Sequence, residues 1–204
     1  MIIKICGITR PEEAEYLIRN HVDFAGVVMY YEKSKRSVDR ETACEIVKAF
    51  KGSNIKTVAV VVSPSKEQLS VIAECGFDYV QIHGELSEEL IRFIPIPILK
   101  AFNVSDMEKY DFYLSFDEIK GFVFDAGEPG SGKTFDWDML KTLKRDLNKL
   151  YILAGGLSAD NVAKAINDVN PDGVDVSSAV EICKELPGKD PEKIDAFVRA
   201  VNQR

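Results

Sequence analysis

The sequence predicts one α/β domain folded as a (β/α)8 barrel, or TIM barrel. Short apolar runs of strand length alternate with helix-period segments, and eight such βα units fit into the 204 residues. No linker rich in proline, glycine and serine divides the chain, so residues 1–204 are expected to form a single barrel domain of small size. An open, doubly wound sheet is the alternative, because sequence alone does not show whether a sheet closes.

The eight expected strands are short apolar runs bounded by turn residues. They cover 2–8, 24–30, 56–62, 79–83, 97–102, 121–126, 151–156 and 173–178. Helical periodicity fills the intervals, at 11–20, 41–50, 66–75, 87–94, 136–147, 158–168 and 191–203, with a weaker pattern at 105–116. Helix start signals at Thr9, Ser87 and Ser158 support three of these helices.

The composition is that of an ordinary globular protein, 46% hydrophobic and 29% charged, with a net charge of -7. Basic residues are spread along the chain, which argues against nucleic-acid binding. The opening MIIKICGIT is too short an apolar run for a signal sequence, and no window approaches the ~18 apolar residues of a membrane helix. We therefore expect a cytoplasmic protein with no membrane partner. A monomer and a homodimer both fit the sequence.

Four cysteines lie far apart, at positions 6, 44, 75 and 183, and no CxxC pair occurs. This spacing argues against a zinc site and, in a reducing cytosol, against a disulfide framework. We expect at most one or two of the four to have a chemical role.

In a barrel of this class, reactive side chains lie at the carboxyl ends of the strands. Cys6 ends the first expected strand and Asp125 the sixth, although the cysteine could be a core residue and the aspartate a loop cap. Lys4 lies on the same side of its strand as Cys6 and could lower the pKa of the thiol. The apolar run before Asp125 could raise the pKa of its carboxyl group. His83 ends the fourth strand, as a ligand contact or a hydrogen-bonded wall residue.

The loops after the last two strands are the expected phosphate site. Gly155 and Gly156 end the seventh strand, and their amides would be open to an anion unless the glycines only form a tight turn. The eighth strand carries Asp175, and Ser177 and Ser178 follow it with hydroxyl donors.

Arg36 lies in a basic loop, 33–38, after the second expected strand. A charged loop is usually just solvated. A guanidinium over the barrel mouth could instead bind a carboxylate through two hydrogen bonds.

Residues 127–134 match the P-loop pattern GxxxxGK[ST] of nucleotide-binding proteins. In a true P-loop a helix starts at the GK[ST] residues, whereas Asp136 is the better helix cap here, which leaves the match within a loop. Nucleotide binding is therefore not expected. We interpret the segment as a flap with glycine hinges that folds over a ligand held at Asp125.

Six motifs resemble, in order, those of the phosphoribosylanthranilate isomerase family of tryptophan biosynthesis. They are KICGIT at 4–9, SKR at 34–36, QIHG at 81–84, the Asp125 segment running to GSGKTFDW at 130–137, AGGLSADNV at 154–162 and GVDVSS at 173–178. The resemblance implies a (β/α)8 enzyme without cofactor or metal that converts N-(5-phosphoribosyl)anthranilate to 1-(2-carboxyphenylamino)-1-deoxyribulose 5-phosphate, an Amadori rearrangement. Its partner is then a small phosphosugar that carries an anthranilate group.

Carried over to this sequence, the resemblance implies that Cys6 is the general base, Asp125 is the general acid and Arg36 binds the anthranilate carboxylate. Backbone amides after the last two strands would hold the phosphate, at Gly155, Gly156, Ser177 and Ser178. His83 and Asp175 complete the expected substrate-binding residues.

Three positions depart from the usual family pattern. Pro129 stands in the flap, Ala179 stands where glycine is usual, and Ser37 replaces a tyrosine beside Arg36. Two alternatives remain: a sister phosphosugar isomerase of histidine biosynthesis, and a non-catalytic barrel that binds a phosphometabolite or a partner protein. The sister isomerases typically use two aspartates as acid and base, whereas the first strand here ends in cysteine.

Overall fold

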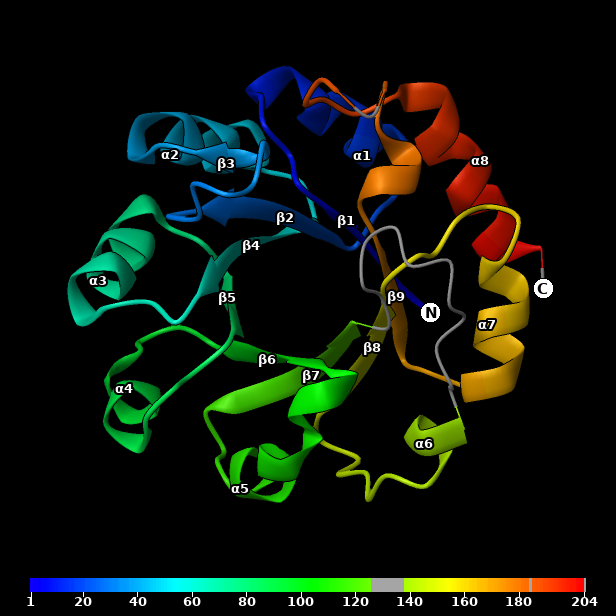
Figure 1. The fold of residues 1–204 in the computed structure, drawn as a ribbon. Helices are drawn as coiled ribbons and strands as arrows, with labels where there is room; N and C mark the ends of the chain where they lie inside the picture. Colours follow the sequence, from blue (N-terminus) through cyan, green and yellow to red (C-terminus); the bar gives the residue numbers. More distant parts are fainter. Residues whose placement is uncertain (126–137, 184, 204) are drawn as a thin grey trace.

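The fold is a closed ring of parallel strands with helices around its outside (Figure 1). The computed structural model describes residues 1–125, 138–183 and 185–203. Along the ring the strand order is β1-β9-β8-β7-β6-β5-β4-β2, and β1 also pairs with β2. That last pairing closes the sheet, so the predicted (β/α)8 barrel is confirmed and the open sheet is excluded.

The eight expected strands are all present, and their bounds differ from the prediction by at most two residues. They are β1 (Ile2–Cys6), β2 (Phe24–Met29), β4 (Lys56–Val62), β5 (Tyr79–His83), β6 (Ile98–Asn103), β7 (Ile119–Asp125), β8 (Leu150–Ala154) and β9 (Gly173–Val176). One further two-residue strand, β3 (Ser37–Val38), pairs with the end of β2.

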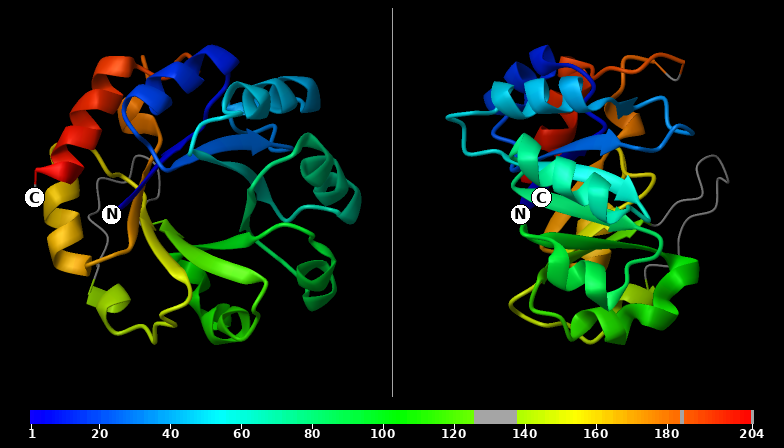
Figure 2. Two further views of the ribbon diagram at one scale, coloured as in Figure 1. Left: turned by 180° about the vertical axis from the view of Figure 1, so that it is seen from behind. Right: turned by 90° about the vertical axis from the view of Figure 1, so that its left-hand side faces the viewer.

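Helices follow the strands and cover the outer surface of the barrel, as the views from behind and from the side show (Figure 2). The α-helices are α1 (Ala14–Arg19), α2 (Arg40–Ala49), α3 (Lys66–Cys75), α4 (Glu88–Phe93), α5 (Tyr110–Leu114), α6 (Asp138–Lys141), α7 (Val162–Val169) and α8 (Pro191–Asn202). Within the described part of the chain, three 3-10 helices lie in the connections: η1 (Pro11–Glu13), η2 (Val104–Lys109) and η3 (Ser178–Val180).

Helix starts agree with the sequence signals in part. Ser87 caps α4 as expected, because its hydroxyl accepts a hydrogen bond from the amide of Leu90 at 3.3 Å. Ser158 does not cap α7: it belongs to a turn in which Asn161 Oδ1 accepts from the Ser158 amide at 2.8 Å, and the helix begins after Asn161. Thr9 is likewise not a cap, since Arg10 directly precedes η1.

The helix expected over 136–147 is much shorter in the described residues, because α6 ends at Lys141. The carboxylate of Asp146 accepts a hydrogen bond from the amide of Asn148 at 2.9 Å, and the amide of Asp146 donates to the hydroxyl of Tyr151 at 3.0 Å. These contacts hold the chain in a turn, which competes with the helical pattern of the sequence.

Two separate apolar layers stabilise the barrel. Outward side chains of the strands pack against the helices in one large cluster. Inward side chains fill the barrel in a second, smaller cluster, formed by Phe24, Val58, Val60, Leu99, Ala101, Val123, Ile152 and Ala154. Successive strand residues alternate between the two layers, as the pleat requires, so the inward-pointing residues of each strand can be read from its sequence.

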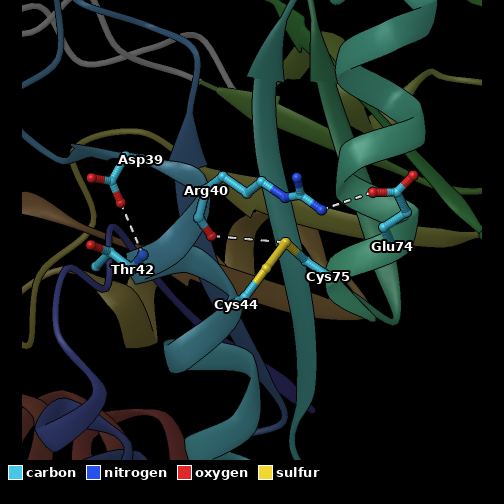
Figure 3. The surroundings of a disulfide bond; sticks show 6 residues. All are labelled: Asp39, Arg40, Thr42, Cys44, Glu74 and Cys75. Carbon is cyan, nitrogen blue, oxygen red and sulfur yellow. Dashed lines mark hydrogen bonds and ion pairs between the residues drawn. A yellow bond between two sulfur atoms is a disulfide. The ribbon is translucent and has the colours of Figure 1, made fainter.

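A disulfide joins Cys44 in α2 to Cys75 at the end of α3 (Figure 3), so the expectation that no disulfide forms was wrong for this pair. The two helices pack side by side and bring the Cα atoms to 4.9 Å, although the cysteines are 31 residues apart in sequence. An ion pair between Arg40 and Glu74, 2.9 Å long, links the same two helices. Cys6 and Cys183 are free thiols.

Candidate active site

Polar side chains occupy the inward positions nearest the carboxyl ends of several strands. Side chains alternate between the inside and the outside of the barrel along each strand. Counting on from the apolar interior residues therefore gives the polar residues that point inward at the mouth, which are Lys4, Cys6, Gln81, His83, Asn103, Asp125 and Asp175. The amino-terminal half of the interior is apolar. The barrel is therefore a packed core with a charged, hydrogen-bonding mouth at one end, which is the end expected to carry chemistry.

Cys6 ends β1 and faces Gly26 of the neighbouring β2. A methyl group at position 26 would lie 3.0 Å from the sulfur and 3.1 Å from Lys4 Nζ, so this glycine makes room for both side chains. Burial raises the pKa of the Cys6 thiol, and the nearby ammonium groups of Lys4 and Lys189 only partly oppose that rise. The expected influence of Lys4 on the thiol is present, but desolvation outweighs it.

Lys4 and Asp175 form an ion pair inside the barrel, with 2.6 Å between Nζ and Oδ2. The side chains are 0% and 7% exposed. Burial would lower the pKa of Lys4, but attraction to Asp175 outweighs it and raises the pKa above the ordinary value. The second carboxylate oxygen, Oδ1, is buried without a hydrogen-bond partner among the described residues. An unsatisfied acceptor at this position suits a ligand hydroxyl.

Asp125 ends β7, as the sequence predicted, in register with Asn103 of β6 and Ala154 of β8. Burial raises the pKa of Asp175, and the negative charge of Asp125 contributes to that rise, so the two carboxyl groups interact across the mouth. The structure thus places Cys6 and Asp125 at one end of the barrel, on strands separated by β8 and β9.

His83 ends β5, and its Nε2 lies 2.9 Å from the side-chain amide nitrogen of Gln81. Burial and the cations Lys4 and Lys100 lower the pKa of His83 to about 4, so the imidazole is neutral at physiological pH. This hydrogen bond fits a wall residue, and the role of His83 as a ligand contact stays a prediction. The side-chain oxygen of Gln81 has no partner among the described residues.

Arg36 is not simply solvated. Its side chain lies over Gly7, the residue after Cys6: a methyl group built there would come within 2.5 Å of Arg36 Cδ. Gly7 has φ +83, a conformation that favours glycine in any case. The Nε of Arg36 donates a hydrogen bond to Glu181, which follows η3. The guanidinium is therefore held between Gly7, the residue after Cys6, and Glu181.

The expected phosphate loops lie next to each other at the ends of β8 and β9. Gly155 and Gly156 have φ values of +85 and +66, so both positions require glycine for their backbone shape. A methyl group at position 156 would meet no atom within 4 Å, so the side of Gly156 on which a Cβ would stand is open. The hydroxyl of Ser177 donates to the carbonyl of Cys6 at 2.9 Å, and Ser178 begins η3.

Several residues of this mouth were missed in the sequence. Gln81 and Asn103 follow the inward alternation of their strands and could have been found from it. Glu181 and Lys189 lie beyond β9 in a segment without periodicity, where they form an antiparallel bridge, and no sequence signal marks them. The P-loop match and the glycine hinges at 127, 130 and 132, with Pro129, lie outside the described residues.

Nearly the whole chain matches one family of known proteins. A family model described as N-(5'-phosphoribosyl)anthranilate (PRA) isomerase matches residues 3–200. The chain belongs to this family. It is therefore a PRA isomerase: it catalyses the Amadori rearrangement of N-(5'-phosphoribosyl)anthranilate in tryptophan biosynthesis. Membership decides against the histidine-pathway and non-catalytic alternatives.

Individual PRA isomerases are similar over their full length. The chain is 39% identical to the N-(5'-phosphoribosyl)anthranilate isomerase of Listeria welshimeri, over 98% of this chain and 97% of the relative. The crystal structure of the Thermotoga maritima enzyme is 37% identical with a TM-score of 0.86, and covers 100% of both chains. A PRA isomerase in complex with reduced 1-(o-carboxyphenylamino)-1-deoxyribulose 5-phosphate is 34% identical with a TM-score of 0.81, again over 100% of both chains.

No helix within residues 1–125, 138–183 and 185–203 has the length and hydropathy of a membrane span.

Proposed function

We propose that Cys6 is the general base and Asp125 the general acid of the PRA isomerase reaction. The observation that carries this proposal is the placement of both side chains at the carboxyl end of one barrel, on strands that approach the mouth from different sides. An acid and a base placed in this way can act on opposite sides of a bound sugar ring. We propose that they need neither a metal nor a cofactor.

The reaction begins with proton transfer from Asp125 to the ring oxygen of the ribose. The C1'–O4' bond breaks, and the nitrogen lone pair of the anthranilate forms a C1'=N iminium ion, which acidifies the hydrogen on C2'. The Cys6 thiolate removes that hydrogen, and the C2'–H electrons form the C1'=C2' double bond of an enolamine. Loss of the 2'-hydroxyl proton and protonation of C1' then give the ketone product.

The raised pKa of Cys6 fits the role of a base. A higher pKa makes the thiolate a stronger base, at the cost of a smaller thiolate fraction at neutral pH. Lys4 and Lys189 place two cations near the sulfur and stabilise the thiolate when it forms. The rate should therefore rise with pH as Cys6 loses its proton.

Groups around the mouth would hold the two ends of the substrate. We propose that Arg36 binds the anthranilate carboxylate and that the amides of Gly155, Gly156, Ser177 and Ser178 bind the phosphate. The unpaired Oδ1 of Asp175 is suited to accept a hydrogen bond from a sugar hydroxyl, and neutral His83 lines the wall. The ligand named for the related complex carries both a carboxyl group and a phosphate, which supports a site with two clamps.

The test is turnover of phosphoribosylanthranilate without added metal or nucleotide, followed by loss of anthranilate fluorescence. Cys6→Ala and Asp125→Asn should each lower kcat by about 10²–10⁴-fold, as expected for a general base or acid. Cys183→Ser removes the other free thiol and should leave kcat unchanged. Wild-type rates in either Cys6→Ala or Asp125→Asn would overturn that residue's assignment.

We also propose that the enzyme acts in the cytoplasm on this one small-molecule partner, without nucleic acid or membrane, as a monomer or homodimer. Sedimentation velocity of the purified protein across a tenfold concentration range separates the two oligomeric states.

A further inference from the structure

Glu181 is a buried carboxylate fixed at the edge of the barrel mouth. Its side chain is 3% exposed, and several backbone contacts hold its segment in place. Its amide donates to the carbonyl of Ser178 at 3.2 Å, and its carbonyl accepts from Lys193 Nζ at 2.7 Å. The antiparallel bridge to Lys189 fixes the segment from the other side. The carboxylate therefore has little freedom to move.

Three cations surround the Glu181 carboxylate. Arg36 Nε donates to one oxygen, Lys35 Nζ lies 2.8 Å from the other, and Lys189 Nζ lies 3.7 Å away. Burial would raise the pKa of Glu181, but hydrogen bonds from Arg36 and Lys35 outweigh burial and hold the pKa below its usual range. The carboxylate is thus charged at neutral pH and able to bind a guanidinium tightly.

Only part of the Arg36 guanidinium is used by this contact. Glu181 accepts from Nε, and the two terminal amino groups have no hydrogen-bond partner among the described residues. The stem of Arg36 crosses Gly7, where a methyl group would lie 2.5 Å from Cδ and 3.3 Å from Nε. The side chain is therefore held at its Nε and lies close to Gly7 along its stem, which leaves its two terminal amino groups available for a ligand.

We infer that Glu181 is a positioning residue that presents the two terminal amino groups of Arg36 to the anthranilate carboxylate. This inference rests on the proposed role of Arg36. Since Glu181 occupies Nε, the substrate carboxylate binds end-on, across the two terminal nitrogens, and not side-on through Nε. Held in this way, the guanidinium loses less side-chain freedom when the substrate binds.

A purely structural role is the competing explanation, because Glu181 also compensates the buried Lys189 and joins the segment after β9 to the barrel. The two roles differ in how they depend on the substrate. A structural role affects every substrate alike. Positioning through Arg36 affects only a substrate that carries the carboxylate.

The experiment compares Glu181→Gln, Glu181→Asp, Arg36→Ala and the double variant Arg36→Ala/Glu181→Gln, each confirmed as folded by circular dichroism. Two substrates are used: phosphoribosylanthranilate, and the phosphoribosyl amine of aniline, which lacks the carboxyl group. Glu181→Asp keeps the charge that Lys189 needs and shortens the side chain by one methylene, so it remains informative if Glu181→Gln does not fold. Lys35→Met removes a different cation of the same carboxylate and is the matched control.

We expect Glu181→Gln and Glu181→Asp to raise the KM for phosphoribosylanthranilate on the order of tenfold, the scale of a lost charge-assisted hydrogen bond, with kcat within about threefold. The aniline substrate should show no such rise. In the Arg36→Ala background, Glu181→Gln should add less than about twofold, because coupled residues are not additive. Lys35→Met should change KM by less than about twofold, because Lys35 is the most exposed of the three cations and Arg36 and Lys189 remain beside the carboxylate.

Equal KM effects on both substrates, additive effects in the double variant, or an unchanged KM in both folded Glu181 variants would overturn the inference. In those cases Arg36→Ala still reports on the proposed function separately. If Arg36→Ala leaves the KM for phosphoribosylanthranilate unchanged, Arg36 does not bind the anthranilate carboxylate. The proposed role of Arg36 and the inference about Glu181 are then both wrong. If Arg36→Ala raises KM and the Glu181 variants do not, only the inference fails.

Discussion

Lys4 Nζ lies 2.6 Å from Asp175 Oδ2 inside the barrel, two residues along β1 from the proposed base Cys6. A buried ion pair is rarely a large source of stability, because desolvation of the two charges offsets their attraction. The position of this ion pair near Cys6 indicates a functional reason for keeping it in the barrel. Lys4 lowers the pKa of Cys6 against the effect of burial, and Asp175 keeps Lys4 charged.

Replacement of Lys4 by methionine should therefore weaken the base. Without the ammonium, the pKa of Cys6 rises further, so the rising limb of kcat/KM against pH moves to higher pH. Each unit of that shift lowers the thiolate fraction at pH 7 about tenfold. The measurement is the pH profile of kcat/KM for both proteins; identical profiles would show that Lys4 does not act on the thiol.

The Lys4→Met change also leaves Asp175 buried without its partner, which typically costs about 3–5 kcal/mol of stability. The double variant Lys4→Met/Asp175→Asn is the control, since it removes both charges. We expect urea denaturation to show most of the stability restored in the double variant, while its activity at pH 7 stays low.

Gly7→Ala should impair the proposed binding of the anthranilate carboxylate by Arg36, because the new methyl group would lie 2.5 Å from Arg36 Cδ. Gly52→Ala is a matched control: Gly52 has φ +88, close to the +83 of Gly7, but no atom lies within 4 Å of the added methyl group. Both changes should cost about 1 kcal/mol of stability for the backbone conformation. Only Gly7→Ala should lower kcat/KM, by roughly tenfold to a hundredfold, as expected for a displaced substrate-positioning group. Equal kinetics in the two variants would contradict this account.

The barrel and the ends of its strands could be predicted from sequence because local signals specify them. Cys6 and Asp125 each close an apolar run, and in a barrel that position alone places them at the mouth. The ends of each apolar run also predict the ends of its strand to within two residues.

Contacts between distant segments could not be predicted in this way. Arg36 and Glu181 are 145 residues apart in sequence, and Cys44 and Cys75 are 31 apart. Each pair meets because elements pack side by side, and neither residue of a pair carries a pattern that points to the other. The net rise in the pKa of Cys6 could not be predicted from sequence either, since it depends on burial by the whole barrel.

His83 should make stability depend on pH below neutrality. Its pKa is about 4 in the folded protein against 6.5 for an ordinary histidine, so between those values the unfolded chain binds a proton that the folded chain does not. Stability is fully present above pH 6.5 and is lost as the pH falls towards 4, by up to about 3 kcal/mol. Because carboxyl groups titrate in the same range, the measurement is the difference in unfolding free energy between wild type and His83→Gln at pH 7 and pH 5.

The other histidine provides the control. His21 is exposed, with φ 51, and asparagine tolerates that backbone conformation. His21→Asn should lose as much stability as wild type between pH 7 and pH 5, whereas His83→Gln should lose less, because only the contribution of His83 is removed. A parallel dependence in all three proteins would show that His83 titrates normally.

The disulfide between α2 and α3 should stabilise the fold without serving catalysis, because both helices lie outside the barrel. Chain-entropy arguments for a separation of 31 residues give about 3–4 kcal/mol, so Cys44→Ser/Cys75→Ser should unfold at lower urea with nearly unchanged kcat/KM. Glu74→Gln breaks the neighbouring exposed ion pair with Arg40 and should cost about 1 kcal/mol or less. Alkylation without reductant should modify only the free thiols of Cys6 and Cys183 and should spare Cys44 and Cys75, in the folded and in the unfolded protein. If dithiothreitol leaves the urea midpoint of wild type unchanged, helix packing alone holds this pair of cysteines together and the crosslink adds nothing.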